Sequence, residues 1–400
     1  MEISSSYIKD IIQKNRDNIA FVIGNGIHCQ YQDFDISWRE LLESLWSKFI
    51  GKQINIPKGI SYTEFYDILE LVFYENNSGS LNNISSKYPR PTLKDFGKIK
   101  TEDLSNLMLK ISQTPPTSNL KKYNSIDLFR NRHSELVSDC RKWCEENIEN
   151  GSDLSDEMCV NLMIETLSNN TKVQILRNSV KQAVARKFQS KDKYNLERCV
   201  NTISKLNAPI LTTNFDTYIS DAINAKQKKL TLQNNEYKFS DFYPWNVYYS
   251  DKEITNPLDG FAVWHINGTK NYPRSIRLGL SDYMGCVERA RKMIQGQSLY
   301  EYFSGKHQEY WVGYSTWLHI IFNKSLFIFG LSLEENEVFL RWLLIQRAKY
   351  RKMFNMPLKG WYIGEVNEGK EFFLEQLGFE IIKIQESNYA PLYEALEAKY

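Results

Sequence analysis

The sequence predicts an α/β protein with a Rossmann-like, mostly parallel sheet and an inserted helical subdomain. Residues 18–24, NIAFVIG, are almost continuously apolar, which is typical of a strand buried on both faces of a parallel sheet. Beyond residue 206, strand-like runs alternate with helical patterns, the order found in doubly wound sheets. Residues 61–205 instead show apolar side chains at helical spacing and no convincing strand.

Each element follows from local patterning. A short helix is expected over residues 4–13, and Ser37 followed by Glu40 is a capping-box pattern that opens another helix. The middle region predicts helices over residues 62–73, 101–111, 134–148, 156–167 and 172–188. Later strands are expected at residues 261–265, 275–278, 325–329, 360–363 and 380–384. Later helices are expected at residues 282–294, 317–323, 335–354, 370–377 and 392–400.

These patterns predict two domains. Residues 1–54 and 206–400 together form the α/β domain, and residues 55–205 form the helical insertion. Inserted helical layers commonly roof a ligand cleft or form an assembly surface.

Composition excludes some classes of function. The 400 residues carry 50 basic and 48 acidic side chains, so a net charge of +2 gives no electrostatic reason to expect direct nucleic-acid binding. The six cysteines include no Cys-x-x-Cys pair; Cys140 and Cys144 share a helical face, but no second ligand pair stands at zinc-site spacing. There is no secretory signal and no apolar run of about eighteen residues, so we expect a cytoplasmic protein without a membrane segment.

Gly24-Asn25-Gly26 ends the first strand. A strand, a glycine turn and a helix in this order bring backbone N–H groups close to a phosphate. The motif is not a full G-x-G-x-x-G, because Cys29 stands at the last position. A tight structural turn is therefore an equal interpretation.

The segment Thr212-Thr213-Asn214-Phe215-Asp216 follows the apolar run 208–211, which predicts polar side chains at the carboxyl edge of the sheet. An amide such as Asn214 suits the cleavage of a glycosidic bond to a cationic leaving group, because it can hold ribose hydroxyls or position water. Asp216 could bond a ribose hydroxyl. Taken alone, the segment is also explained by an Asx turn in which Asp216 caps the next helix.

Two further strand ends carry polar residues. His265 closes the strand that contains Trp264 and precedes Gly268, and a histidine at this edge can act as a general base near neutral pH. A structural role is the alternative for a lone histidine. Gly330 and Ser332 follow the apolar run 325–329, where they could contact the adenosine half of a dinucleotide.

In combination, these motifs resemble the sirtuin-like family of NAD-processing proteins, and most closely its bacterial branch that hydrolyses NAD in anti-phage defence. Gly24-Asn25-Gly26-Ile27-His28 is similar to the family's G-A-G-[IF]-S loop, with departures at Asn25 and His28. Residues 212–216 match [TS]-[TQ]-N-[YFI]-D, His265 with Gly268 matches the catalytic histidine, and Gly330-Leu331-Ser332 matches a G-x-S loop. The two spaced Cys-x-x-Cys pairs of deacetylating sirtuins are missing after His265.

The resemblance implies an NAD glycohydrolase (NADase) that releases nicotinamide and ADP-ribose, with NAD as the substrate and no metal. Asn214 would position water and the nicotinamide ribose, and His265 would be the general base. The loop 24–27 would hold the pyrophosphate, and Asp216 and Ser332 would anchor riboses. The residues expected to contact NAD are Gly24, Asn25, Gly26, Ile27, Thr213, Asp216, Gly330 and Ser332.

The resemblance also implies regulation, because unrestrained NAD hydrolysis kills a cell. We expect no appended sensor domain, and therefore expect a homo-oligomer gated by a separate partner, such as a HerA-class ATPase, that acts in abortive infection. Two alternatives stay open: an NAD-dependent protein deacylase or ADP-ribosyltransferase, and a non-catalytic module that senses NAD or ADP-ribose.

Overall fold

The computed structural model describes most of the chain as two compact units. The first comprises Met1–Ser37 and Ala185–Tyr400, and the second comprises Trp38–Val184. The domain boundaries expected at 54/55 and 205/206 stay a prediction. The described residues are 4–31, 37–78, 134–148, 150–166, 169–187, 196–230, 239, 243–295, 297–305, 311–384 and 388–398.

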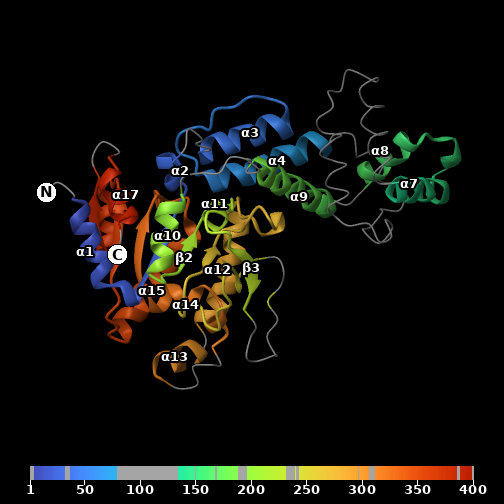
Figure 1. Ribbon diagram of the computed structural model, residues 1–400. Helices are drawn as coiled ribbons and strands as arrows, with labels where there is room; N and C mark the ends of the chain where they lie inside the picture. Colours follow the sequence, from blue (N-terminus) through green and yellow to red (C-terminus); the bar gives the residue numbers. More distant parts are fainter. Residues whose placement is uncertain are drawn as a thin grey trace. The chain divides into compact units, whose positions relative to one another are not determined.

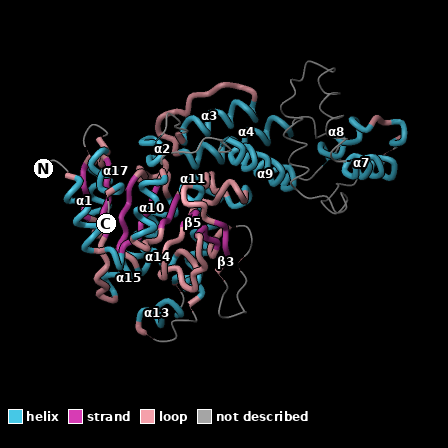
Figure 2. Tube along the Cα trace, viewed as in Figure 1, coloured by secondary structure: helices cyan, strands magenta, loops and turns pink. Residues whose placement is uncertain are grey.

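The first unit is built on an eight-stranded sheet in the order β3-β4-β5-β2-β1-β6-β7-β8 (Figure 2, magenta). The six strands from β5 to β8 in this order are parallel, while β4 pairs antiparallel with both β3 and β5. The strands are β1 (Ile19–Ile23), β2 (Ile210–Thr212), β3 (Lys226–Lys229), β4 (Val247–Ser250), β5 (Val263–His265), β6 (Ser325–Phe329), β7 (Gly360–Gly364) and β8 (Glu380–Lys383). This confirms an α/β fold with a mostly parallel sheet.

Helices surround these strands in the first unit (Figure 1). They are α1 (Ser5–Lys14), α2 (Gly26–Tyr31), α10 (Glu197–Lys205), α11 (Tyr218–Asp221), α12 (Leu280–Ile294), α13 (Gln297–Phe303), α14 (Leu318–Asn323), α15 (Val338–Met353), α16 (Glu368–Gln376) and α17 (Ala390–Glu397). Short 3-10 turns lie at Arg16–Asn18, Pro273–Ser275 and Val312–Ser315. In the parts of the chain that can be described, no helix is both long and apolar enough to cross a membrane.

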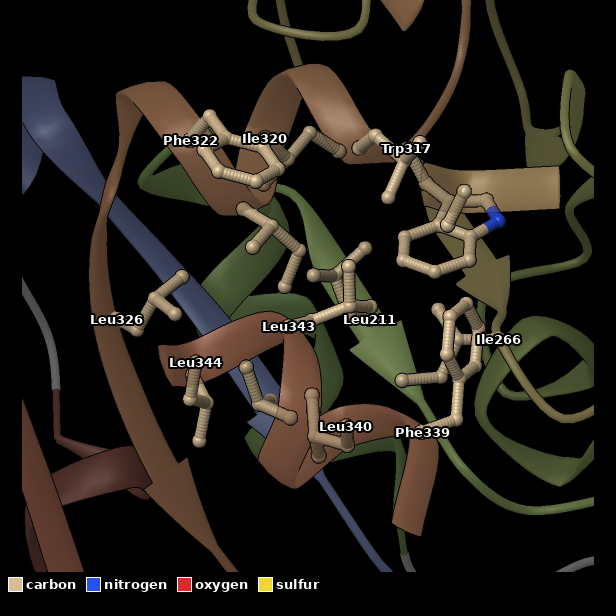
Figure 3. Close-up of a cluster of buried hydrophobic side chains, with 14 of the residues drawn as sticks. Leu211, Ile266, Trp317, Ile320, Phe322, Leu326, Phe339, Leu340, Leu343 and Leu344 are labelled. Carbon is tan, nitrogen blue, oxygen red and sulfur yellow. The ribbon is translucent and has the colours of Figure 1, made fainter. Parts of the chain in front are cut away.

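Both faces of the sheet are buried, which explains the apolar character of β1. Ala20 and Val22 belong to a core with α12, α14 and α15, whereas Ile19, Phe21 and Ile23 belong to a second core with α1, α10 and α17. Figure 3 shows part of the first core. There, side chains of α15 pack with those of the strands and α14; the labelled residues are Leu211, Ile266, Trp317, Ile320, Phe322, Leu326, Phe339, Leu340, Leu343 and Leu344.

The described part of the second unit contains helices and no strand, as the sequence predicts. Its helices are α3 (Trp38–Ile50), α4 (Tyr62–Ser78), α7 (Ser134–Asn147), α8 (Asp156–Thr166) and α9 (Asn169–Lys187), with a 3-10 turn at Gly151–Asp153. Helices α3 and α4 pack through aromatic rings, because the centroids of Trp46 and Phe65 lie 5.1 Å apart. The helix expected at 101–111 lies outside the described residues.

One sequence prediction is wrong, and two strands were not predicted. The strand expected at 275–278 is absent, because Pro273–Ser275 form a 3-10 turn and residues 276–278 are a loop. Ile276 and Leu278 are apolar because the loop itself is buried. The antiparallel strands β3 and β4 were not predicted, and β3 escapes detection because its sequence is KQKK. Lysines on this outermost strand discourage further strand pairing.

Candidate functional site

Four chain segments end at one edge of the sheet. His265 of β5, Thr212 of β2, Ile23 of β1 and Phe329 of β6 stand side by side as the last paired residues of their strands. Because these strands are parallel, the segments that follow them share the carboxyl edge. Strand β1 lies between β2 and β6, so the later strands of the sheet are placed on both sides of β1. Such a switch point is where open α/β sheets bind ligands.

The glycine turn after β1 contacts the loop after β6. Gly26 N donates to Gly330 O at 2.7 Å, and Gly24 N donates to Phe329 O at 3.1 Å. A Cβ atom added to Gly24 would lie 2.4 Å from Gly330 O, and one added to Gly26 would lie 2.8 Å from Gly330 Cα. Gly330 itself has a φ of +63°, which favours glycine. All three glycines are therefore required by the close approach of the two loops.

Four backbone N–H groups of this turn donate hydrogen bonds within the protein. Besides Gly24 and Gly26, His28 N donates to Asn25 O at 2.9 Å, and Ile27 N donates to Gly24 O at 3.4 Å. The Ile27 side chain is fully buried in the core, so only its backbone faces the turn. A phosphate at this turn would have to share these donors, of which Ile27 N makes the longest bond.

Asn214 is held at the edge by its neighbours. Thr212 Oγ1 donates to Ile23 O at 3.0 Å and accepts from Asn214 N at 3.1 Å, which fixes the backbone of the segment after β2. The Asn214 side-chain amide lies 3.3 Å from Gly24 O and 3.2 Å from His28 Nε2. Thr212 was not among the predicted site residues, although it belongs to the same motif.

Asp216 makes two bonds inside the protein. Its Oδ1 accepts from Tyr218 N at 3.0 Å, which is the Asx turn considered from the sequence, and its Oδ2 lies 2.9 Å from His28 Nε2. Burial on its own would raise the pKa of Asp216, but the charge and hydrogen bond of His28, with the Tyr218 N–H, hold it below its usual value. Asp216 is therefore an ionised carboxylate that is almost completely buried. Its role as a ribose anchor stays a prediction.

His265 is oriented by the backbone of Asn214. Its Nδ1 lies 2.9 Å from Asn214 O, and because a carbonyl only accepts, Nδ1 carries the proton. Nε2 of the neutral ring then holds a lone pair, and it is buried with no hydrogen-bond partner among the described residues. Burial lowers the pKa of His265, which keeps the ring neutral near pH 7. This is the state that a general base requires.

His28 joins the cluster from α2, a residue whose role the sequence left open. Its ring is 4% exposed and meets the Tyr218 ring edge-on at 5.5 Å. His28 contacts both Asn214 and Asp216 through Nε2. Only its departure from the family's usual serine marked it in the sequence.

The other predicted residues lie at the same edge with fewer contacts. Thr213 is buried, and its backbone N donates to Ile23 O at 3.2 Å. Asn25 is half-buried in the glycine turn. Ser332 is exposed, and its backbone oxygen accepts from the Tyr362 hydroxyl at 3.2 Å. Ser332 is thus the predicted residue least tied to the cluster around Asn214.

Metal ligation finds no support in the described residues, where no three His, Cys, Asp or Glu side chains gather closely enough to hold an ion. Cys140 and Cys144 of α7 are both buried, and Cys144 Sγ contacts Cys159 O at 3.7 Å. Burial raises the pKa of Cys140, and it raises that of Cys144 to about 12. These buried thiols are therefore protonated near neutral pH.

Comparison with protein families finds a SIR2-like domain over residues 208–381. The match includes Asn214, Asp216, His265 and the β6 loop, but it begins after the glycine turn and His28. A comparison with curated proteins found no match. SIR2-like domains use NAD.

Proposed function

Through residues 208–381 this chain belongs to the sirtuin-like family, and we propose that it is an NAD glycohydrolase that releases nicotinamide and ADP-ribose. The family supports an NAD-related enzymatic function in general. The hydrolytic activity is inferred from the arrangement around Asn214 and His265.

The single observation that carries the proposal is the unpartnered lone pair of His265. Its Nε2 is buried at the carboxyl edge of the sheet without a hydrogen-bond partner among the described residues. Buried polar atoms normally have partners, and one that lacks a partner at a ligand-binding edge calls for an explanation. A substrate hydroxyl or an attacking water would supply the missing donor. The glycine turn and the β6 loop lie at the same edge, which suits an extended dinucleotide.

The proposed reaction requires little from the protein beyond positioning and one base. The bond between C1′ of the ribose and the pyridinium nitrogen breaks, and nicotinamide leaves neutral with the bonding electrons. A water oxygen bonds to C1′ and gives its proton to His265 Nε2. The transition state resembles an oxocarbenium ion, so the Asn214 amide serves by orienting the ribose and the water.

Binding of the rest of NAD is proposed for the loops beside this pair. The turn 24–27 would take the pyrophosphate, with Ile27 N as the donor most easily shared. Thr213, Asp216, Gly330 and Ser332 would contact the riboses and the adenosine half. No step of the proposed chemistry needs a metal.

Control of such an activity is part of the proposal. We propose a cytoplasmic effector of bacterial anti-phage defence that depletes NAD during abortive infection. Activation would come from homo-oligomer assembly or from a partner such as a HerA-class ATPase. The support for this is the resemblance to the defence branch and the toxicity of unrestrained NAD hydrolysis.

Product analysis of the purified full chain tests the proposal, with and without a candidate partner such as a HerA-class ATPase. In the activated state, NAD as the sole substrate should yield nicotinamide and ADP-ribose in equal amounts. Turnover that appears only with an acylated peptide or an acceptor protein would identify a deacylase or an ADP-ribosyltransferase. Binding of NAD by calorimetry without any product, with the candidate partner present as well as absent, would identify a sensing module.

A further inference from the structure

One nitrogen of His28 faces two polar side chains. His28 Nε2 lies 2.9 Å from Asp216 Oδ2 and 3.2 Å from Asn214 Nδ2. All three side chains are at most 6% exposed, so water cannot readily replace either neighbour. The Asn214 amide has a second neighbour, Gly24 O at 3.3 Å.

A single ring nitrogen cannot bond both neighbours at once. An ionised carboxylate only accepts hydrogen bonds, so Nε2 must carry a proton to bond Asp216. An amide nitrogen only donates, so Nε2 must present a lone pair to bond Asn214. The orientation of the Asn214 amide is fixed by Gly24 O, because a carbonyl attracts the amide nitrogen and repels the amide oxygen.

The shorter contact and the ionised state of Asp216 decide between the two. Burial of Asp216 opposes its ionisation, yet its neighbours keep its pKa below the usual value, so the carboxylate requires the Nε2 proton. With that proton committed, Asn214 Nδ2 donates one hydrogen to Gly24 O. Its other hydrogen finds no acceptor at His28.

We propose that His28 is a positioning residue that, by donating a hydrogen bond from Nε2–H to Asp216, leaves one N–H of Asn214 free to bind the ribose of the substrate. The inference rests on the proposed NAD hydrolysis for its effect on rate. If Nε2 carried no proton, its lone pair would accept a hydrogen bond from the Asn214 amide. That N–H group would then no longer be available to the substrate. His28 thus acts through Asn214 and need not touch NAD.

Two substitutions of His28 distinguish the role of Nε2 from that of Nδ1. In His28→Gln the side-chain amide nitrogen can occupy the place of Nε2 and donate to Asp216, whereas in His28→Asn the amide reaches only the place of Nδ1. We expect His28→Gln to retain kcat within about tenfold of the wild type, and His28→Asn to lose about 100-fold in kcat through misplacement of Asn214.

Nicotinamide release by the full chain supplies the rates, and thermal unfolding of each variant checks that it is folded. Equal large losses in two folded variants would overturn the proposal, since the imidazole itself would then be needed. Rates equal to the wild type in both would overturn it as well. If His28→Asn fails to fold, His28→Gln alone decides, because a loss of about 100-fold there contradicts the proposal.

The position of the proton can be measured without any turnover. In the full chain with 15N-labelled histidine, the His28 signals are those that disappear in His28→Gln. The expected spectrum has a protonated Nε2 at neutral pH. A lone pair on Nε2 would overturn the inference. Protonated Nε2 in a protein that releases no nicotinamide would instead count against the proposed function.

Discussion

Asn214 and His265 are joined by a hydrogen bond between the ring of the histidine and the backbone of the asparagine, with His265 Nδ1 2.9 Å from Asn214 O. The bond leaves the Asn214 side chain free for other contacts and fixes which His265 nitrogen carries the lone pair. The proposed base and the proposed orienting amide are therefore placed by one interaction. Thr212 reinforces it by accepting from Asn214 N at 3.1 Å.

The pH dependence of turnover should reflect the protonation of the His265 ring. Burial lowers the pKa of this ring below its ordinary value of 6.5, and only the neutral ring can accept a proton. Activity should therefore decline towards low pH as the ring becomes protonated, with the midpoint of this acid limb below pH 6.5. The profile of kcat/KM against pH for nicotinamide release measures this.

Replacement of His265 by Gln is the control for that profile. The variant has no titrating base and should show a rate at least about 100-fold lower, without the acid limb. An acid limb centred above pH 6.5 in the wild type would contradict the assignment.

The stability of the fold should depend on Glu337, which precedes α15. Burial raises the pKa of Glu337 to about 7 in the folded protein, from 4.5 in the unfolded chain. Glu337 therefore costs the folded state no stability below about pH 4.5, and its cost grows as the pH rises to about 7. The shift corresponds to about 3 kcal/mol of unfolding free energy. Urea denaturation across this pH range measures the loss.

Glu337→Gln should remove this part of the pH dependence, because a neutral amide has no buried charge to form. Glu335→Gln is the matched control, since Glu335 lies two residues earlier and is exposed. A similar slope in the wild type and in Glu337→Gln would show that Glu337 does not ionise over this range.

The contact between the glycine turn and the β6 loop should not tolerate a side chain. A Cβ atom at Gly24 would lie 2.4 Å from the backbone oxygen of Gly330, so Gly24→Ala must displace one of the loops. We expect a loss of about 1–3 kcal/mol in unfolding free energy, together with slower turnover. Thermal unfolding and nicotinamide release measure the two effects.

Gly285→Ala supplies the contrast, because Gly285 lies within α12 and a Cβ atom there meets nothing within 4 Å. This substitution should stabilise the protein by about 0.5–1 kcal/mol. A Gly24→Ala variant as stable as Gly285→Ala would contradict the packing of the two loops.

Much of the fold could be predicted because burial on both faces leaves a continuous apolar signal. Strands β1, β6 and β7 carry that signal, and all their residues are buried. Strand β3 could not be predicted, because its side chains are mostly exposed lysines and give no apolar signal. It is held in the sheet by backbone pairing with β4. The loop at 275–278 misled for the opposite reason, since a buried loop can be as apolar as a strand.

The site was predictable only in part. Polar residues after successive parallel strands must meet at one edge, so the proximity of Asn214, Asp216 and His265 follows from the sequence pattern. The contact of His28 with Asp216 does not follow, because it joins residues 188 positions apart and depends on side-chain direction within a short helix. Nor does the sequence reveal that four N–H groups of the glycine turn already donate hydrogen bonds within the protein.

The central claim is that Asn214 and His265 form an NAD-cleaving site, and the rate of nicotinamide release by the wild type and by Asn214→Ala tests it most directly. Asn214 N and O are backbone atoms, so the substitution leaves the bond to His265 intact and removes only the side-chain amide. We predict steady release of nicotinamide by the activated wild-type protein and a loss of at least about 100-fold in a folded Asn214→Ala variant. Equal rates in the two proteins would contradict the account.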